Sequence, residues 1–450
     1  MAKLKKFKAF ADSLFPSEVA YVESNNDFQD PELVSILRSL KTHVTRDPSR
    51  VVFDPSIDPR KYSRMIGNFE NKLQKIDVDY YYGWISIINH EITTDAISPR
   101  QQTRIIKEME AFEPDWFHMG SFYRLVKHYE GYLLMRYREK DYHTVTEFLE
   151  KYREKYNENE TTAARIRELS RVIVFGDAQK VATEELNWLR EVFETVSISK
   201  KTRYSAFLAY LMFHINTRVF EKLPALVQQL EEAIYHGDFY SRRILANFYA
   251  NKLLVLNYAG KYEEAAFCGF QSIKHHTEDY LYYLNNYSSV LMHLNRFEDA
   301  IVNMKASLAL YRETRDRNRR LIFISNYSRC LNQVKNYRKS VRLCGQFLDE
   351  MDQQIISLRW HYFFRMYFTA LFQLDSCEQI IRLERKYRLV DREKKAGFQP
   401  YLSIFRLGAG FREVKYTTRE FKDQLSRLKS DMANQKSEIQ ELIDEVGRVV

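Results

Sequence analysis

The chain of 450 residues is poor in glycine, proline and cysteine, and each shortage excludes a class of structure. With only 13 glycines, it has little material for the glycine-rich loops that hold nucleotide phosphates. It contains no Gly-x-x-x-x-Gly-Lys-Ser/Thr loop, no Gly-x-Ser-x-Gly elbow and no His-Glu-x-x-His helix. We therefore predict a protein that is not an enzyme and that needs no cofactor.

The four cysteines are scattered along the second half of the chain. They form no Cys-x-x-Cys pair, and no histidine follows at the spacing that a zinc site requires. We expect neither a disulfide framework nor a metal site, but reduced cysteines buried by packing. These cysteines are Cys268, Cys330, Cys344 and Cys377.

Proline is concentrated at one end of the chain. Seven of the nine prolines lie in the first 114 residues, so that only Pro224 and Pro400 interrupt the remainder. Because proline breaks helices, this distribution favours a long helical array after residue 114. Long apolar runs are also missing, and no stretch suits a signal peptide or a membrane span. We therefore expect a cytoplasmic protein.

What the sequence does contain is a repeated pattern in its second half. An asparagine is followed by two apolar residues, an aromatic residue and a small residue, at spacings of five, three, three and three positions. The copies lie 35 and then 40 positions apart, a period typical of stacked helical hairpins. The copies are Asn251, Leu256, Ala259, Tyr262, Ala265; Asn286, Leu291, Leu294, Phe297, Ala300; and Asn326, Leu331, Val334, Tyr337, Ser340.

Each copy predicts a first helix, a turn and a second helix. The aromatic residue follows a short polar break at Gly260-Lys261, Asn295-Arg296 or Lys335-Asn336. An i, i+4, i+7 stripe on each first helix predicts its packed face, and the asparagine falls on the opposite face at about 100° per residue. The stripes are Tyr249, Leu253, Leu256; Leu284, Ser288, Leu291; and Ile324, Ser328, Leu331.

These residues resemble the tetratricopeptide repeat family, in which the second helix opens with Gly-x-Tyr/Phe-x-x-Ala. The segment Gly260–Ala265 is the best match. The resemblance covers about residues 200 to 390, lacks the family's tryptophan and closing proline, and exceeds the usual period of about 34 residues. It implies an all-α solenoid, in which helical hairpins form a right-handed superhelix with a concave groove for extended peptides.

We predict that the protein is a scaffold that binds a peptide segment of a partner protein. An asparagine amide can pair with one backbone N–H and one C=O of an extended chain, as we expect of Asn251, Asn286 and Asn326. The alternative is that these amides bond between adjacent repeats. The family resemblance adds as groove residues Asn247, Leu254, Asn257, Tyr258; Tyr282, Asn285, Ser289, Met292, His293; and Ile322, Ser325, Arg329, Asn332, Gln333.

A basic cluster offers a second function. The chain has a net charge of +9, and ten basic residues lie between Tyr311 and Arg342 against only Glu313 and Asp316. Such a cluster could attract nucleic acid or another acidic ligand, although charge runs are also common on solvated helices. The cluster comprises Arg312, Arg315, Arg317, Arg319, Arg320, Arg329, Lys335, Arg338, Lys339 and Arg342.

Weaker copies flank the three clear ones. Met366 and Leu371 continue the spacing downstream, while Phe220 and the segment Lys140–Val145 suggest degenerate units upstream. The predicted organisation is an N-terminal arm with a short helix at 1–60, a helical region at 61–200, the repeat array at 201–395, a linker at 396–416 and a coiled-coil-like helix at 417–450.

The last segment carries apolar residues at alternating spacings of four and three. Eight of nine such positions are apolar, which predicts a coiled coil and a possible homodimer. The alternative is that this helix caps the solenoid of its own chain. The nine positions are Phe421, Leu425, Leu428, Met432, Gln435, Ile439, Leu442, Val446 and Val449.

Overall fold

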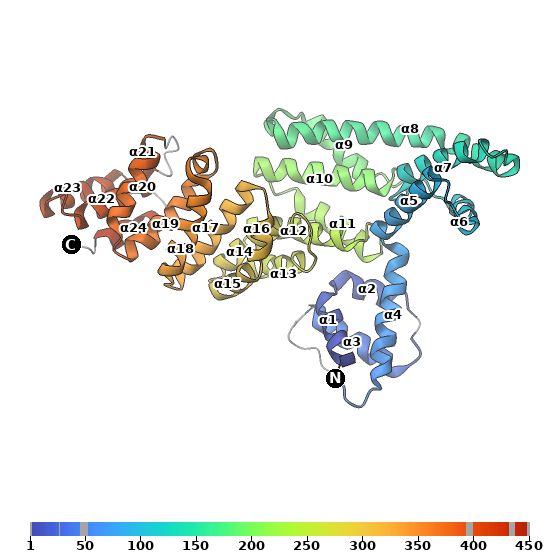
Figure 1. The fold of residues 1–450 in the computed structure, drawn as a ribbon, viewed down its shortest axis with the longest axis horizontal. Helices are drawn as coiled ribbons and strands as arrows, with labels where there is room; N and C mark the ends of the chain where they lie inside the picture. The colour runs from blue at the N-terminus through green and yellow to red at the C-terminus, as the bar shows by residue number, and fades with distance from the viewer. Residues whose placement is uncertain (1, 27, 46–52, 393–398, 432–436, 448–450) are drawn as a thin grey trace. The chain divides into compact units, whose positions relative to one another are not determined.

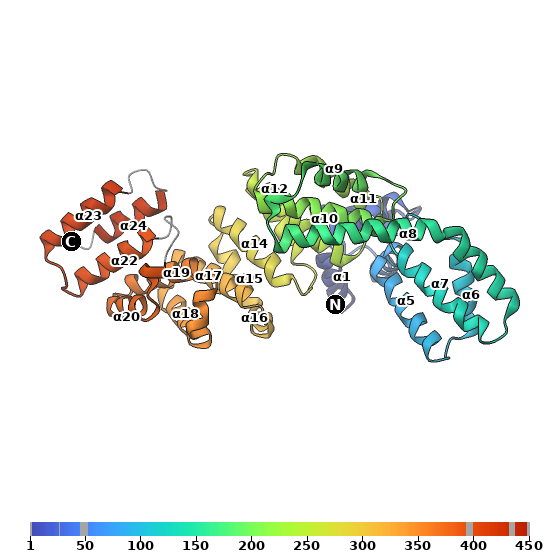
Figure 2. The same ribbon diagram turned by 90° about the horizontal axis from the view of Figure 1, so that it is seen from above.

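The computed structural model describes residues 2–26, 28–45, 53–392, 399–431 and 437–447, which form helices joined by turns and loops (Figures 1 and 2). No strand occurs within these ranges, which confirms the all-α fold class. The chain divides into two compact units, Met1–Phe248 and Tyr249–Val450. This division falls inside the segment that we predicted as the repeat array, rather than near residue 200.

In the first unit the helices are α1 (Ala2–Ser13), α2 (Pro16–Ser24), α3 (Pro31–Thr45), α4 (Pro59–Ile76), α5 (Val78–Thr93), α6 (Pro99–Glu110), α7 (Met119–Leu134), α8 (Glu139–Phe175), the short 3-10 helix η1 (Ala178–Lys180), α9 (Thr183–Glu194), α10 (Lys200–Thr217) and α11 (Leu223–Tyr235). Helix α12 (Arg242–Tyr258) contributes residues to both units.

In the second unit they are α13 (Tyr262–Ser272), α14 (Tyr280–His293), α15 (Phe297–Ala306), α16 (Leu308–Glu313), α17 (Arg317–Gln333), α18 (Tyr337–Met351), the 3-10 helix η2 (Asp352–Ser357), α19 (Trp360–Gln373), α20 (Cys377–Tyr387), α21 (Leu389–Arg392), α22 (Gln399–Arg412), α23 (Thr418–Asp431) and α24 (Ser437–Gly447). None of the described helices has the length and apolar character that crossing a bilayer requires.

The three predicted breaks between first and second helices are confirmed. Gly260, Asn295 and Lys335 each adopt a left-handed backbone conformation with φ between 56° and 73°. In each turn the next N–H donates to the carbonyl of the motif leucine five residues earlier, as in Lys261 to Leu256 at 3.0 Å. This bond satisfies a carbonyl that the end of the first helix leaves without a partner.

The same turn recurs well beyond the three copies, at intervals of about 40 residues or twice that. Tyr137, Arg218, Asp375 and Val414 also have positive φ, and each is followed by the same five-residue hydrogen bond. The turns at Tyr137 and Arg218 precede α8 and α11, where we predicted degenerate units. One helix-ending geometry thus recurs from the first unit to α22.

The predicted packed stripes are confirmed by burial. Eight of the nine stripe residues are fully buried, and Leu256 is half-buried. In the second unit α14 contacts α13, α15 and α17, and α17 contacts α18 and α19, so that consecutive helices share one core. Gly269 permits the close approach of α13 and α14, since a Cβ there would meet the ring of Tyr287 at 2.3 Å. Whether these contacts wind into a right-handed superhelix stays a prediction.

The N-terminal 60 residues differ from the predicted arm. They contain three helices, α1 to α3, which pack on one another and on α4. Leu14 and Phe15 are fully buried, and the ring of Phe7 lies 4.8 Å from that of Tyr62 on α4. The buried residues of α3, such as Leu33, Ile36 and Leu40, recur at helical spacing, and the shorter α1 and α2 pack with α3 and α4 in one cluster.

The predicted linker at 396–416 also differs, because its described part forms α22. Ile404 and Phe405 of this helix are fully buried. Helix α22 contacts α19, α20, α23 and α24, and so belongs to the core of the second unit. Gly408 of this helix serves close packing, because a Cβ there would meet Val446 at 2.7 Å.

The C-terminal segment forms two helices, α23 and α24, instead of the single helix that we predicted. The two helices contact each other and α22. Phe421, Ile439 and Val446 are buried in the core of their own chain, as in the capping alternative. Apolar residues at this spacing suit either a coiled coil or a cap on the same chain, because each needs only one apolar surface to pack against. Met432, Gln435 and Val449 lie outside the described residues, and a homodimer stays a prediction.

Candidate functional site

The candidate site is the side of the first helices that lies opposite their buried stripe. In α14 four residues follow one another at spacings of four, three and four, and so share one side of the helix. Equivalent residues in α17 and α19 lie 40 and 80 positions further on. We call these twelve residues the first-helix face: Tyr282, Asn286, Ser289, His293; Ile322, Asn326, Arg329, Gln333; and Tyr362, Met366, Thr369, Gln373.

The core covers the first-helix face only in part, because four of the twelve residues are exposed and six are half-buried. Tyr282 is 41% exposed, and Arg329 and Tyr362 are half-buried. Only Asn326 and Met366, in the middle of α17 and α19, are buried. Helix α14 contacts α17 and α17 contacts α19, so the three helices that carry this face follow one another in the second unit (Figure 1).

Three predicted contact residues instead tie neighbouring helices together. The Asn326 amide donates to the backbone carbonyl of Asn285 at 3.3 Å, and the Asn285 amide donates to the carbonyl of Arg319 at 3.4 Å. The Asn332 amide donates to the carbonyl of Met366 at 2.9 Å. These bonds are the inter-repeat role that the sequence left open as the alternative.

The three motif asparagines are therefore not equivalent. Asn326 uses one of its two amide N–H donors on Asn285, and its Oδ1 accepts no hydrogen bond from the described residues. Asn286 is half-buried, and its enclosed Nδ2 finds no acceptor in the described part of the chain. Asn251 is also half-buried. Because Asn326 is buried and one of its donors is bound to Asn285, it does not present the two-sided pairing with a peptide that we predicted.

The other predicted groove residues have mixed positions. Tyr258 is 54% exposed, and the exposed ring of His293 stacks on Tyr262 at 4.9 Å. Asn257 is half-buried, with an enclosed Oδ1 that no described residue reaches with a donor. Asn247 belongs to the first unit, where it accepts a hydrogen bond from the Tyr204 hydroxyl at 2.9 Å. The structure thus places Tyr282, His293 and Arg329 on the first-helix face, whereas Asn285 and Asn332 lie outside that face and are buried.

The sequence alone did not identify Tyr362 and Arg365, which both lie on α19. Tyr362 occupies the position of Tyr282 and Ile322, and the guanidinium of Arg365 lies 4.0 Å from the ring of Tyr401. Burial raises the pKa of the Tyr362 hydroxyl, while the nearby Arg329 guanidinium acts in the opposite direction. The spacing of 40 residues was the signal that could have identified Tyr362.

The basic cluster is divided by the fold. Arg319 pairs with Asp279 at 2.9 Å, and Arg320 pairs with Glu350. The exposed remainder lies at the two ends of α17, a helix of 17 residues that is about 25 Å long. That separation exceeds the Debye length of about 8 Å at physiological salt, so the two groups do not act as one field. The nucleic-acid function stays a prediction that this geometry does not favour. The groups are Arg312, Arg315, Arg317 and Lys335, Arg338, Arg342.

The cysteines have no reactive environment. All four are buried and none is in a disulfide, and burial raises the pKa of the Cys330 and Cys344 thiols to about 12. A thiol of that pKa stays protonated near neutral pH and is a poor nucleophile and metal ligand. Within the described ranges, no group of three or more His, Cys, Asp and Glu side chains could hold a metal ion.

No family model, no curated protein and no solved structure matches the chain. Membership of the tetratricopeptide repeat family therefore stays a prediction that rests on the repeated residues and their spacing.

Proposed function

We propose that the protein is a non-enzymatic scaffold of tetratricopeptide-like repeats. In this proposal the regularly spaced turns stack helical hairpins into a right-handed solenoid, and the first-helix face binds an extended peptide segment of a partner protein. The observation that carries the proposal is the row of uncovered side chains on α14, α17 and α19, opposite the buried stripe.

The composition of the face suits a protein interface. Tyrosine and arginine dominate the residues that contribute most to binding energy, and Tyr282, Arg329 and Tyr362 are of these types. None of the twelve residues is acidic, while Arg329 is cationic, so the expected peptide is neutral or acidic. The amides of Asn285 and Asn326 support the binding surface by fixing the distance between the helices that carry it. A surface that is ordered before binding loses less entropy on binding.

The proposal is tested with a double variant of the full chain, Tyr282→Ala with Arg329→Ala. Affinity purification should recover a partner with the native protein and lose it with the variant. Truncation of two central interface residues of this kind weakens binding by at least about tenfold. The control is Val302→Ala, because Val302 is 66% exposed on α15 and lies outside the first-helix face.

Helical content and melting temperature show whether each variant is folded. Partner recovery that is equal for the double variant and the Val302→Ala control would refute the first-helix face as the binding surface. Recovery that falls steeply with salt for all three proteins would instead support the two basic groups around α17.

A further inference from the structure

A cavity of about 710 Å³ lies in the first unit between α7, α8 and α10. Helices α8 and α10 lie side by side and run in the same direction: Ser199 bonds to Asn159 near the start of the contact, and Asn216 bonds to the Ile173 carbonyl near its end (Figures 1 and 2). The volume falls within the range of about 300 to 1,000 Å³ that is typical of small-molecule sites.

The cavity exists because small side chains line the two facing helices. Ala163 and Ser170 on α8 face Ser205 and Ala209 on α10, and Gly120 lies at the start of α7. Residues with larger side chains at these positions would fill the space, since protein interiors are otherwise close-packed. The sequence therefore leaves a groove where it could have packed two helices tightly.

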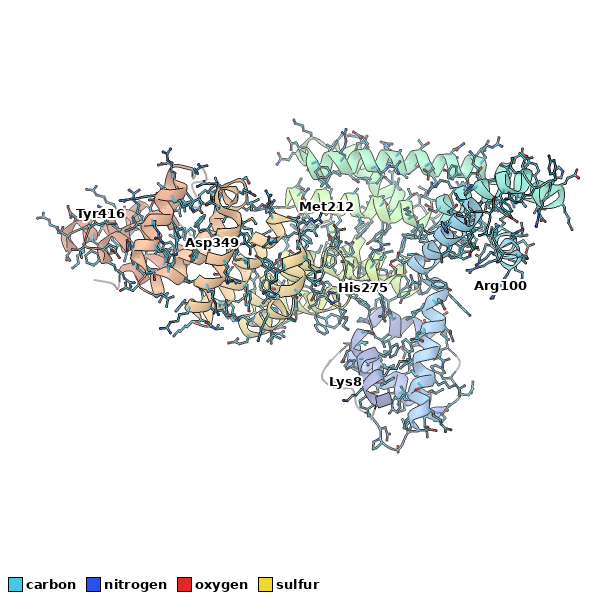
Figure 3. All side chains as sticks on the ribbon, in the orientation of Figure 1. Lys8, Arg100, Met212, His275, Asp349 and Tyr416 are labelled. Carbon is cyan, nitrogen blue, oxygen red and sulfur yellow. The ribbon has the colours of Figure 1, made fainter. Side chains whose placement is uncertain are left out.

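One end of the cavity is apolar. Ile166 and Ile173 of α8 are buried, and they face Leu208 and Met212 of α10, the latter labelled in Figure 3. At the same end Phe175 is 86% exposed, which is unusual for a phenylalanine in a described helix of this chain. An apolar chain in the cavity would cover these side chains and remove them from water.

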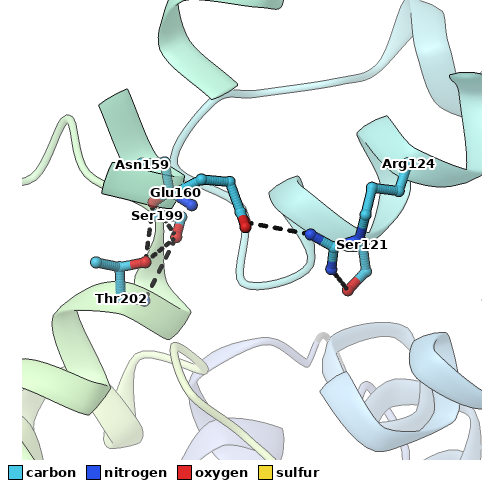
Figure 4. A network of polar contacts seen from close by, with 6 residues as sticks. All are labelled: Ser121, Arg124, Asn159, Glu160, Ser199 and Thr202. Atoms are coloured by element: carbon cyan, nitrogen blue, oxygen red, sulfur yellow. Dashed lines mark hydrogen bonds and ion pairs between the residues drawn. The ribbon is translucent and has the colours of Figure 1, made fainter. Parts of the chain in front are cut away.

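The other end is polar and is held by a buried network (Figure 4). The Oδ1 of Asn159, a residue that is only 9% exposed, accepts from the Ser199 hydroxyl at 2.8 Å and from the Thr202 hydroxyl at 2.9 Å. These two bonds fix the amide, and its Nδ2 donates to no described residue. The Nδ2 carries an unused donor and lies beside Gly120, 3.9 Å from the place that a Cβ would take, next to Arg124.

The charges around this end favour an anion. At this end Arg124 and Lys201 line the cavity with one carboxylate, that of Glu160, while Arg167 and Arg171 lie further along α8, where Arg171 pairs with Glu168 at 2.6 Å. Arg124 donates to Glu160 at 3.2 Å and to the Ser121 hydroxyl at 3.2 Å (Figure 4). Neither Arg167 nor Lys201 forms an ion pair within the described ranges. The unused amide donor, with the Arg124 guanidinium beside it and Lys201 on the adjoining end of α10, is complementary to a carboxylate.

We propose that this cavity binds a linear amphiphile with an anionic head group, of the long-chain carboxylate class. The head group accepts from the Asn159 amide and lies near Arg124, and the apolar chain extends along α8 toward Val174. The distance from Glu160 to Val174 along the helix is roughly 21 Å. A helix of a partner protein is about 10 Å wide, so it would cover the rim without reaching the buried Asn159. This proposal concerns the first unit and does not depend on the peptide-binding proposal.

Titration calorimetry on the full chain tests the proposal with decanoate as the probe. Decanoate should bind at one site, whereas decyltrimethylammonium, which has the same chain and the opposite charge, should not. Arg124→Gln should weaken decanoate binding by about tenfold, because it removes a charged donor. Its control is Arg190→Gln, which breaks a similar arginine–glutamate pair at 2.8 Å outside the cavity and should leave binding unchanged.

A second variant tests the apolar chain. Ser205→Leu places a larger side chain in the groove at a half-buried position and should abolish decanoate binding while the melting temperature stays close to the native value. Decanoate binding that survives Ser205→Leu, or equal binding of decanoate and decyltrimethylammonium, would overturn the proposal. So would the failure of decanoate to bind the native chain at millimolar concentration, which would leave the groove to a partner helix.

Discussion

The side-chain amide of Asn326 donates to the backbone carbonyl of Asn285 and so ties α17 to α14. Asn332 makes the corresponding bond from α17 to α19, through the carbonyl of Met366. Both asparagines are buried, and both donors are taken up by a neighbouring helix. Amides that we assigned to peptide binding from the sequence therefore hold neighbouring helices at a fixed distance.

This geometry predicts different costs for similar substitutions. Asn326→Ala and Asn332→Ala should each lower the free energy of unfolding by about 1 to 3 kcal/mol, because each leaves buried polar groups without a partner. Asn286→Ala is the matched control, since the Nδ2 of Asn286 reaches no acceptor among the described residues. Its cost should stay within about 0.5 kcal/mol. Urea denaturation measures all three, and equal losses would refute the inter-helix role.

A second prediction concerns Glu18, which is fully buried. Its carboxylate accepts from the Phe15 backbone N–H at 2.9 Å, the Tyr240 hydroxyl at 2.7 Å and the Arg242 guanidinium at 3.0 Å. Glu18→Ala should lower the free energy of unfolding by about 1 to 3 kcal/mol, because it leaves the Phe15 N–H and the buried Tyr240 hydroxyl without their acceptor.

The control for this substitution is Glu168→Ala. Glu168 pairs with Arg171 at 2.6 Å, but both side chains are mostly exposed to water. An exposed pair of this kind contributes at most about 1 kcal/mol, so denaturant midpoints should separate the two variants clearly. Similar midpoints for both variants would mean that the Glu18 network does not hold the first unit together.

Much of the second unit could be predicted from the sequence, because its repeats use local signals. The breaks at Gly260, Asn295 and Lys335 and the buried stripes follow from the residues around each turn. Long-range contacts leave no such signal: Glu18 meets Tyr240 more than two hundred positions away. Tyr137 and Arg218 adopt the left-handed turn although neither is a glycine, so their turns could not be identified by residue type.

The candidate binding surfaces also depend in part on long-range contacts that the sequence does not reveal. The face that carries Tyr282 and Arg329 could be predicted from the spacing, whereas the use of the Asn326 donor depends on where the next helix packs. The cavity at Asn159 depends on small residues from three helices, which are far apart in the sequence and share no motif. Periodicity identifies the side of one helix, but not the space that several helices leave between them.

A third prediction concerns pH. The ring of His118 stacks on Tyr81 at 4.1 Å, and its two ring nitrogens are enclosed without a partner among the described residues. Burial, with Lys200 and Lys201 nearby, lowers the pKa of His118 to about 3. The unfolded chain binds this proton near pH 6.5, so the free energy of unfolding should fall as the pH decreases from about 6.5 toward 3.

The substitution His118→Phe isolates this effect, because phenylalanine keeps the stacked ring and cannot bind a proton. Urea denaturation should show that the free energy of unfolding decreases less between pH 7.5 and pH 4.5 for the variant than for the native chain. His90→Phe, at an exposed position, serves as the control and should follow the native chain. Parallel losses for all three proteins would show that His118 does not bind fewer protons in the folded state.

The last prediction concerns the C-terminal helices. The rings of Phe411 and Phe421 lie 4.4 Å apart, and Val446 packs against Gly408 of α22. If α23 and α24 cap their own chain, Phe421→Ala should lower the free energy of unfolding by about 3 to 5 kcal/mol. The control is Lys422→Ala at the exposed neighbouring position, which should change this free energy by no more than about 0.5 kcal/mol.

Deletion of residues 417–450 should then expose the apolar side of α22 and yield a protein that aggregates. Light scattering of the full-length and truncated proteins measures this outcome. A truncated protein that stays soluble, with repeats that melt at the native temperature, would contradict the cap. If the full-length protein were then a dimer and the truncated one a monomer, the apolar stripe would instead pair two copies of the chain, as its spacing of four and three allows.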